Sequence, residues 1–215
     1  MEKQFNSDEV PLAQLLGWAE NGHLQLPDFQ RGWVWDDDHV KSLLVSISLS
    51  YPIGAVMTLV AGNPDVNFKA RLLEGVALPA TPSPGVLLLD GQQRVTSLFQ
   101  ALKSQAPVCT KNHRGKELHL HYYADIKACI DPSVDREDKG IFSVPADRIQ
   151  RSSFGRTIDL DLSTRDREIA EEMFPLDIVF DNRKTMAWQM AYLRPGPSYD
   201  ERYEKWGQFV DAVIN

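Results

Sequence analysis

The apolar positions of this chain alternate between the spacing of helices and the spacing of strands. A helical period predicts a first helix over 11–20, which Asn21-Gly22 ends. A second helix is predicted over 39–50, where Tyr51-Pro52 ends it. One of the three consecutive aspartates at 36–38 can cap this second helix.

Strands are predicted between and after these helices. Proline and glycine mark the segment 24–35 as a strand that passes into an ordered loop. The apolar run 55–60 is typical of a buried strand, and 68–73 is a plausible strand within a hairpin or excursion. A further apolar run, 86–89, predicts a strand that lies centrally in a small mixed sheet.

The second half of the chain continues the alternation with shorter elements. The expected strands are 118–123, 142–144 and 176–180, and the expected helices are 164–173 and 183–193. The charged segment 131–139 is expected to be exposed. A last helix from Tyr199 has an aromatic face and is expected to be peripheral and partly unpacked. We therefore expect one domain over 1–195, and a C-terminal helix over 196–215 that begins a further domain.

The most informative stretch is the turn after the strand 86–89, with the sequence Asp90-Gly91-Gln92-Gln93-Arg94. It opens directly into an amphipathic helix that should pack on the strand through Val95, Leu98, Phe99 and Leu102. Free N–H groups at a helix start attract anions, and glycine allows a ligand to approach closely. An arginine one turn into the helix can add donors to phosphate oxygens. The turn therefore predicts a phosphate site.

Each side chain of this turn also has a simpler structural role open to it. Arg94 can pair with Asp90 and brace the turn. Asp90 can act as a magnesium ligand, as a base that orients water, or only as a helix cap. Gln92 and Gln93 can donate amides to phosphate or position a water, but they are also ordinary residues at a helix start.

A second candidate is Arg31, which follows Gln30 in a loop that proline and two tryptophans should hold still. A rigid loop arginine suits a phosphate clamp. The alternatives are an ion pair or a stack on Trp33 or Trp35. We expect Gln30 and Arg31 to face the turn at Gly91 across one cleft.

Composition narrows the class of protein. The 215 residues are 43% apolar and 25% charged, which is enough for a real core in one domain or one domain with an appendage. The net charge of −7 argues against a broad surface that coats nucleic acid. Two cysteines without CxxC spacing point to a reducing cytoplasm and to neither a disulfide framework nor zinc. The sequence has no apolar run of about 20 residues, so no membrane span is expected.

Two motifs together resemble a known family. Pro27-Asp28-Phe29-Gln30-Arg31, followed by Val34-Trp35, precedes Leu89-Asp90-Gly91-Gln92-Gln93-Arg94 by about sixty residues. In that order they resemble the N-terminal domain of GmrSD-type restriction proteins, a family of the ParB/sulfiredoxin-like superfamily. Gly91-x-x-Arg94 also resembles the nucleotide-phosphate turn of ParB and sulfiredoxin. The resemblance is strongest over 10–105 and extends more loosely to about 190.

The resemblance implies an α/β (α+β) domain with a ParB/sulfiredoxin-like small mixed sheet flanked by helices. Such domains bind nucleoside triphosphates with Mg2+, and studied relatives hydrolyse them as part of bacterial defence against phage with modified DNA. The implied nucleotide-binding residues are Gln30, Arg31, Gly91, Gln92, Gln93 and Arg94. The implied catalytic residues are Asp90, Gln93 and Arg94, with Asp90 also as the metal ligand.

Departures from the resembled families limit these expectations. Sulfiredoxin needs a cysteine in its turn, where this chain has Gln92 and Gln93, so sulfinic-acid reduction is excluded. A His-Asn-His nuclease constellation is absent from the sequence, and relatives usually carry it in a further domain. No Walker-type Gly-x-x-x-x-Gly-Lys occurs either. Two function classes stay open: a triphosphatase, and a non-catalytic module that senses a nucleotide or a DNA modification and regulates a partner nuclease.

For three other polar groups we expect a structural or solvated role rather than a binding role. The aspartates at 36–38 suit a solvated helix start better than a divalent ion. His119 and His121 share a strand face as two zinc ligands would, but without a third ligand nearby we expect surface or core histidines. The basic segment 111–116 is expected to be a solvated loop rather than a contact for nucleic acid.

Overall fold

The computed structural model describes residues 7–62 and 68–214. Within these ranges the strands form two four-stranded sheets and one separate hairpin, and helices accompany both sheets. The chain is therefore a mixed α+β protein, as the alternating periods predict. In the described parts of the chain, no helix combines the length and the apolar character needed to cross a bilayer.

The first sheet positions the candidate site. Its strands are β2 (Met57–Val60), β4 (Val86–Asp90), β1 (Leu24–Pro27) and β3 (Ala70–Arg71), in that order. β1 and β4 run parallel, and the two outer pairs are antiparallel. β4 thus lies between two neighbours in a small mixed sheet, which confirms the prediction for 86–89.

β2 is an edge strand, and most of its side chains are exposed. Val60, for example, has 73% of its surface exposed. The prediction of a buried strand over 55–60 is therefore wrong in its burial, although a strand is present. A continuous apolar run suggests burial on both faces, but it does not reveal whether anything covers the strand.

Three helices extend the core from this sheet toward the second one: α1 (Leu12–Glu20) packs against β1 and α3, and α2 (Asp37–Ser48) packs against α3 (Gln92–Leu102) and the second sheet. Asp36 caps α2 by accepting a hydrogen bond of 3.0 Å from the N–H of His39. One of the three aspartates at 36–38 was expected to do so. The apolar face of α3 is buried in the same core as Leu88 of β4, through Val95, Leu98, Phe99 and Leu102. The predicted packing of this helix is confirmed.

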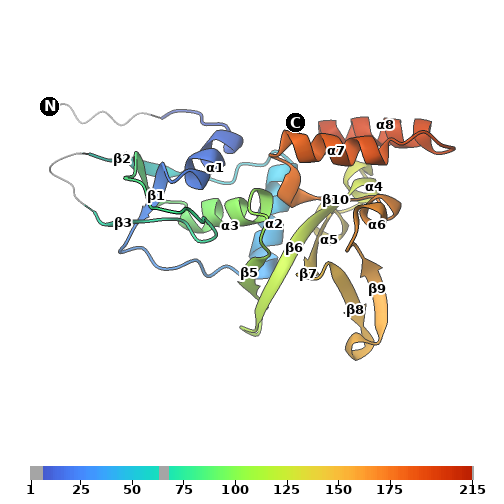
Figure 1. The fold of residues 1–215 in the computed structure, drawn as a ribbon, viewed down its shortest axis with the longest axis horizontal. Coiled ribbons are helices and arrows are strands. Elements are labelled where there is room, and N and C mark those ends of the chain that lie inside the picture. Colours follow the sequence, from blue (N-terminus) through green and yellow to red (C-terminus); the bar gives the residue numbers. More distant parts are fainter. Residues whose placement is uncertain (1–6, 63–67, 215) are drawn as a thin grey trace.

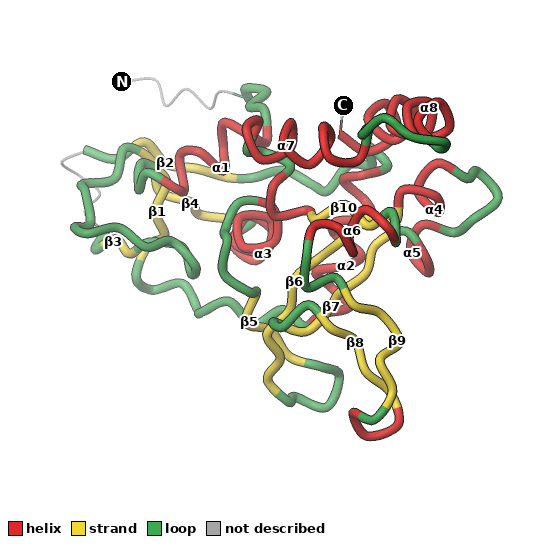
Figure 2. Tube along the Cα trace, turned by 45° about the vertical axis from the view of Figure 1, so that its right-hand side comes forward, coloured by secondary structure: helices red, strands yellow, loops and turns green. Residues whose placement is uncertain are grey.

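The second sheet is built around one long strand, β6 (Glu117–Asp125). It pairs antiparallel with β5 (Val108–Lys111), β7 (Ile141–Pro145) and β10 (Met173–Pro175). Figures 1 and 2 show α3 between the two sheets, and α2 packs against α3 and β7, so that one continuous core joins the sheets.

Two predictions for the second half need correction. The segment 176–180 is not a strand, because the strand there is β10, which ends at Pro175, and a single 3-10 turn, Leu176–Ile178, follows it. Its apolar residues are buried without strand pairing. The hairpin of β8 (Ile149–Ser152) and β9 (Thr157–Asp161) was not predicted, although Ile158 and Leu160 of β9 alternate with polar residues as in a strand.

The remaining helices are α4 (Ile126–Ile130), α5 (Arg136–Lys139), α6 (Arg165–Ala170) and α7 (Asn182–Tyr192). The last two confirm the helices predicted over 164–173 and 183–193. The segment 131–139 is mostly exposed, as expected, but Val134 and Arg136 are half-buried. Arg136 donates to the carbonyl oxygens of Ser48 at 2.6 Å and of Cys129 at 2.7 Å, and so ties α5 to α2 and α4.

The C-terminal helix α8 (Tyr199–Phe209) continues into a π-helical turn, Val210–Ile214. We expected it to be peripheral and partly unpacked, but Trp206 and Phe209 are buried in the core. Their rings pack against Phe174 and Trp188. The expectation holds for the outer part of the aromatic face, where Tyr203 is 62% exposed, and it fails for Trp206 and Phe209, which find their partners in β10 and α7.

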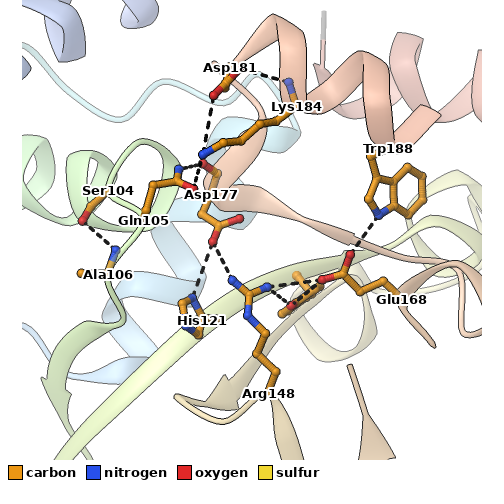
Figure 3. Close-up of polar contacts among 11 residues, drawn as sticks. Ser104, Gln105, Ala106, His121, Arg148, Glu168, Asp177, Asp181, Lys184 and Trp188 are labelled. Carbon is orange, nitrogen blue, oxygen red and sulfur yellow. Dashed lines mark hydrogen bonds and ion pairs between the residues drawn. The ribbon is translucent and has the colours of Figure 1, made fainter. Parts of the chain in front are cut away.

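A buried polar cluster holds the second sheet to α6 and α7 (Figure 3). Arg148 lies 3.0 Å from Asp177 and 3.3 Å from Glu168, and Trp188 donates to Glu168 at 3.2 Å. His121 lies 3.6 Å from Asp177 on the other side. Burial raises the pKa of Glu168, against the opposing effects of these partners. The cluster is part of the framework of the second sheet.

Candidate functional site

A cleft of about 370 Å³ opens between the loop 28–35 and the turn from β4 into α3. It is lined by every residue predicted for the site, together with three neighbours: Phe29, Gln30, Arg31, Trp35, Leu89, Asp90, Gly91, Gln92, Gln93 and Arg94. The expected meeting of the two motifs across one cleft is therefore confirmed. What each residue does there follows from its contacts.

Gly91 is the N-cap of α3 and has a left-handed backbone, with φ of 90°. A side chain here would be strained, and its Cβ would lie 3.2 Å from Cγ2 of Val56. Because Gly91 has no side chain, it leaves the N–H groups of the first turn of α3 uncapped by its own residue. These groups are the anion-attracting feature that the sequence predicts.

Gln30 and Gln92 fasten the two motifs together. Gln30 donates its side-chain amide to the carbonyl oxygens of Leu88 at 2.7 Å and Leu89 at 2.9 Å. Gln92 donates in the opposite direction, to the carbonyl oxygen of Arg31 at 2.6 Å. The loop and the turn therefore hold each other through reciprocal hydrogen bonds from side chain to backbone.

Gln93 uses both ends of its amide for the same purpose. Its Nε2 donates to the carbonyl oxygen of Gly32 at 3.2 Å, and its Oε1 accepts from the N–H of Val34 at 2.9 Å. An amide that pairs with a carbonyl and an N–H of one extended segment fixes the position of that segment. The sequence offered phosphate binding or water positioning for this residue, and the structure gives its side chain a bracing role.

Arg94 turns toward the segment before β2. Its guanidinium donates to the carbonyl oxygens of Ile53 at 2.5 Å and Ala55 at 2.9 Å, and it lies 3.6 Å from the carboxylate of Asp90. The ion pair with Asp90 is the bracing alternative that the sequence left open. Arg94 still lines the cleft, but most of its donors are bound to the chain itself.

Arg31 differs from Arg94 because the residue is exposed, and its guanidinium has no hydrogen bond, ion pair or ring contact among the described residues. Only its backbone carbonyl is held, by Gln92 and by Arg71. The alternatives of an ion pair or a stack on tryptophan are not realised there. Arg31 is thus the arginine of the cleft that is free to bind an anion.

The loop 28–35 has further supports that sequence reasoning missed. Arg71 donates to the carbonyl oxygen of Arg31 at 3.2 Å, and Glu74 accepts from the N–H of Trp33 at 3.1 Å. The indole of Trp33 donates to Ser97 at 2.8 Å. Both tryptophans pack against the core, which supplies the anchoring expected of this loop. Arg71 and Glu74 are half-buried, and the sequence carried no signal for this role.

A divalent cation in this cleft would have few protein ligands. Asp90 is the acidic residue that lines it, and the side chain is 72% exposed. Within 7–62 and 68–214, the one group of three potential ligand residues is Cys109, Glu117 and His119, in the second sheet. A single carboxylate fits Mg2+, which commonly binds through one or two carboxylates, water and substrate phosphates.

The chain is similar to a known protein and to a known family, and the family match covers both motifs of the cleft. An uncharacterised protein of Methanocaldococcus jannaschii is 33% identical over 106 residues, which are 47% of this chain. The match spans 18% of that relative's own length. The family model for the N-terminal domain of GmrSD restriction endonucleases matches residues 12–187. Since that match covers most of the chain, the protein belongs to the family of GmrSD restriction endonuclease N-terminal domains.

Proposed function

We propose that the cleft binds the phosphates of a nucleoside triphosphate with Mg2+, as part of a restriction system that acts on modified DNA. The observation that supports the proposal is that Arg31, whose side chain has no partner among the described residues, lines the same cleft as the first turn of α3. An uncapped helix start and an arginine fork are two complementary ways to hold phosphate oxygens. The cleft volume of about 370 Å³ lies within the range of small-molecule sites, roughly 300 to 1,000 Å³.

In this proposal Asp90 holds Mg2+ together with the phosphates of the nucleotide. The cation would neutralise charge on the phosphates when bound. Asp90 is exposed enough to take this part, and its distance of 3.6 Å from Arg94 is a loose ion pair. The main phosphate contacts then come from Arg31, the N–H groups after Gly91, and the remaining donors of Arg94.

We further propose that hydrolysis is slow in the isolated chain. The catalytic residues of the proposal are Asp90, Gln93 and Arg94. Gln93 has both ends of its amide bound to the loop, and Arg94 donates to two carbonyl oxygens. Both would have to leave these partners to act on a water or on a transferring phosphate, which favours weak turnover.

The same contacts favour a second candidate, a sensor without turnover. Because Gln92 and Gln93 bind the backbone of the loop 28–35, a ligand that displaces either amide would also move the loop. Such a loop can pass the state of the cleft to a nuclease on another domain or chain. In this version the ligand is a nucleotide or a modified DNA phosphate, and no phosphate is released.

Calorimetry with the four common nucleoside triphosphates and Mg2+ tests the proposal on the full chain. Arg31→Ala should weaken binding about tenfold or more, since a charge-assisted contact is worth about 1.5 to 3 kcal/mol. Its melting temperature should stay unchanged, because the guanidinium has no partner among the described residues. Arg156→Ala is the matched control, as an exposed arginine on the hairpin of β8 and β9.

Phosphate release then separates the two candidates. Triphosphate binding with release that Asp90→Ala abolishes would support the enzyme, and binding without release would support the sensor. Undetectable triphosphate binding by the wild type, or equal affinities for Arg31→Ala and Arg156→Ala, would overturn the proposed site. If duplex DNA binds instead and its affinity survives both Arg31→Ala and Arg94→Ala, the cleft is not the phosphate site.

A further inference from the structure

Three different metal-ligating side chains meet on the exposed side of β5 and β6. Cys109 of β5 is the register partner of His119 on β6, and Glu117 lies two residues before His119 on the same strand face. One ligand atom from each residue lies within 4.8 Å of the other two. Cross-strand pairing thus brings together a thiol, an imidazole and a carboxylate that are separated in sequence.

Glu117 stands between the other two groups. Its Oε1 lies 3.1 Å from Nε2 of His119, at hydrogen-bond distance. Partial burial raises the pKa of the Cys109 thiol, and the Glu117 carboxylate raises it further. Lys111, the register partner of Glu117, acts in the opposite sense as the smallest of these effects.

The donor set fits one class of cation best. Zinc takes sulfur, nitrogen and oxygen ligands at about 2.0 to 2.3 Å, so donors around a tetrahedral ion lie roughly 3.3 to 3.8 Å apart. The observed limit of 4.8 Å is close enough for small side-chain rotations to complete the set. All three residues are exposed, so an ion can enter and a water can take the fourth position.

We propose that Cys109, Glu117 and His119 form a zinc site that joins β5 to β6, with water as the fourth ligand. The cation would offset the charge of Glu117 and bind Cys109 as a thiolate, whose proton leaves to solvent. The sequence argued against zinc because the two cysteines lack CxxC spacing and because no third ligand lies near His119 and His121 along the chain. In the folded chain His121 is buried beside Asp177 and is not part of the site. His119 lies instead with Glu117 and with Cys109, which comes from the neighbouring strand.

The site is tested by metal titration of the full chain with Zn2+ and with Co2+ as a spectroscopic substitute. Calorimetry should give one equivalent of Zn2+, and the Co2+ protein should show a thiolate-to-metal charge-transfer band. Cys109→Ser should abolish that band. Since even loss of an indirect partner costs about 10 to 100-fold in metal affinity, Cys109→Ser and His119→Gln should each weaken Zn2+ binding at least tenfold.

The control is His113→Ala, because His113 is exposed in the turn of the same hairpin and belongs to no potential ligand group in the described residues. It should bind Zn2+ like the wild type. Far-UV circular dichroism of the metal-free variants checks that each one folds. If Cys109→Ser does not fold, His119→Gln alone carries the test. A Co2+ spectrum without a thiolate band, or equal Zn2+ affinity in His119→Gln and His113→Ala, would overturn the site.

Discussion

The side-chain amide of Gln92 donates a hydrogen bond of 2.6 Å to the carbonyl oxygen of Arg31, 61 residues earlier in the chain. Gln92 is buried on the first turn of α3, and Arg31 is exposed in the loop 28–35. This bond holds the backbone of Arg31 beside the start of α3. The two motifs are therefore parts of one structural unit before any ligand is considered.

Gln92→Met should loosen this unit while filling nearly the same volume. Loss of the donor should lower the free energy of unfolding by about 1 kcal/mol, up to about 3 if the Arg31 carbonyl stays desolvated. Arg71 remains as a second partner for that carbonyl, which favours the lower end. Urea unfolding measures the change, and hydrogen exchange should show faster exchange in the loop 28–35.

Gln14→Met is the matched control for this substitution, because Gln14 is exposed near the start of α1. It should change the free energy of unfolding by no more than about 0.5 kcal/mol. Equal stability of the two variants, with unchanged exchange in the loop, would show that the bond from Gln92 does not hold the loop in solution.

Gly91→Ala should destabilise the protein and disturb the cleft. A left-handed backbone with φ of 90° costs a residue with a Cβ about 1 kcal/mol or more, and this Cβ would also press on Val56 at 3.2 Å. Thermal unfolding measures the loss of stability, and calorimetry measures the accompanying loss of triphosphate affinity.

Substitutions at two other glycines serve as controls that separate the backbone strain from the contact with Val56. Gly155→Ala meets open space at φ of 84°, so it carries the backbone strain without the contact. Gly207→Ala lies within α8 in open space and should stabilise the protein by about 0.5 to 1 kcal/mol. If Gly91→Ala loses no more stability than Gly155→Ala, the turn relaxes away from Val56.

Asp36→Ala should remove the cap of α2 in a pH-dependent manner. The hydrogen bond from the N–H of His39 is the main cause that lowers the pKa of Asp36 below 3.8. A lowered pKa in the folded state means stability that is present above pH 3.8 and is lost as the pH falls through the folded value. Near neutral pH the variant should lose about 0.5 to 2 kcal/mol.

Asp36→Asn keeps the capping oxygen and should lose much less. Urea unfolding of wild type and both variants, at neutral pH and at steps below pH 3.8, measures the difference. The gap between wild type and Asp36→Ala should narrow as the pH falls. A gap that stays constant would mean that the charge of Asp36 contributes nothing to the cap.

The sequence predicts the first half of the fold well because its elements carry local signals. The 3.6-residue period and the stop at Asn21-Gly22 define α1, and a capping aspartate before an amphipathic stretch defines α2. The same holds for the turn at Gly91, where an apolar strand, a glycine and an amphipathic helix follow one another. Each of these signals lies within about a dozen residues.

The features that the sequence did not predict depend on partners far along the chain. The bracing roles of Gln93 and Arg94 depend on carbonyl oxygens of the loop 28–35 and of Ile53 and Ala55. The meeting of Cys109 with His119 depends on strand register. Backbone acceptors are the same for every residue type, so no pattern of side chains points to them.

The burial of the C-terminal helix is a long-range effect of the same kind, and it leads to the last prediction. Trp206 of α8 is 6% exposed, and its ring centroid lies 5.6 Å from that of Trp188 and 5.7 Å from that of Phe174. Trp206→Ala should therefore lower the free energy of unfolding by about 3 to 5 kcal/mol. Tyr203→Ala is the control on the same helix, since Tyr203 is 62% exposed and should cost much less. Urea unfolding followed by far-UV circular dichroism measures both. If Trp206→Ala unfolds at the same midpoint as Tyr203→Ala, α8 does not belong to the core in solution, and the expectation of a peripheral helix would be restored.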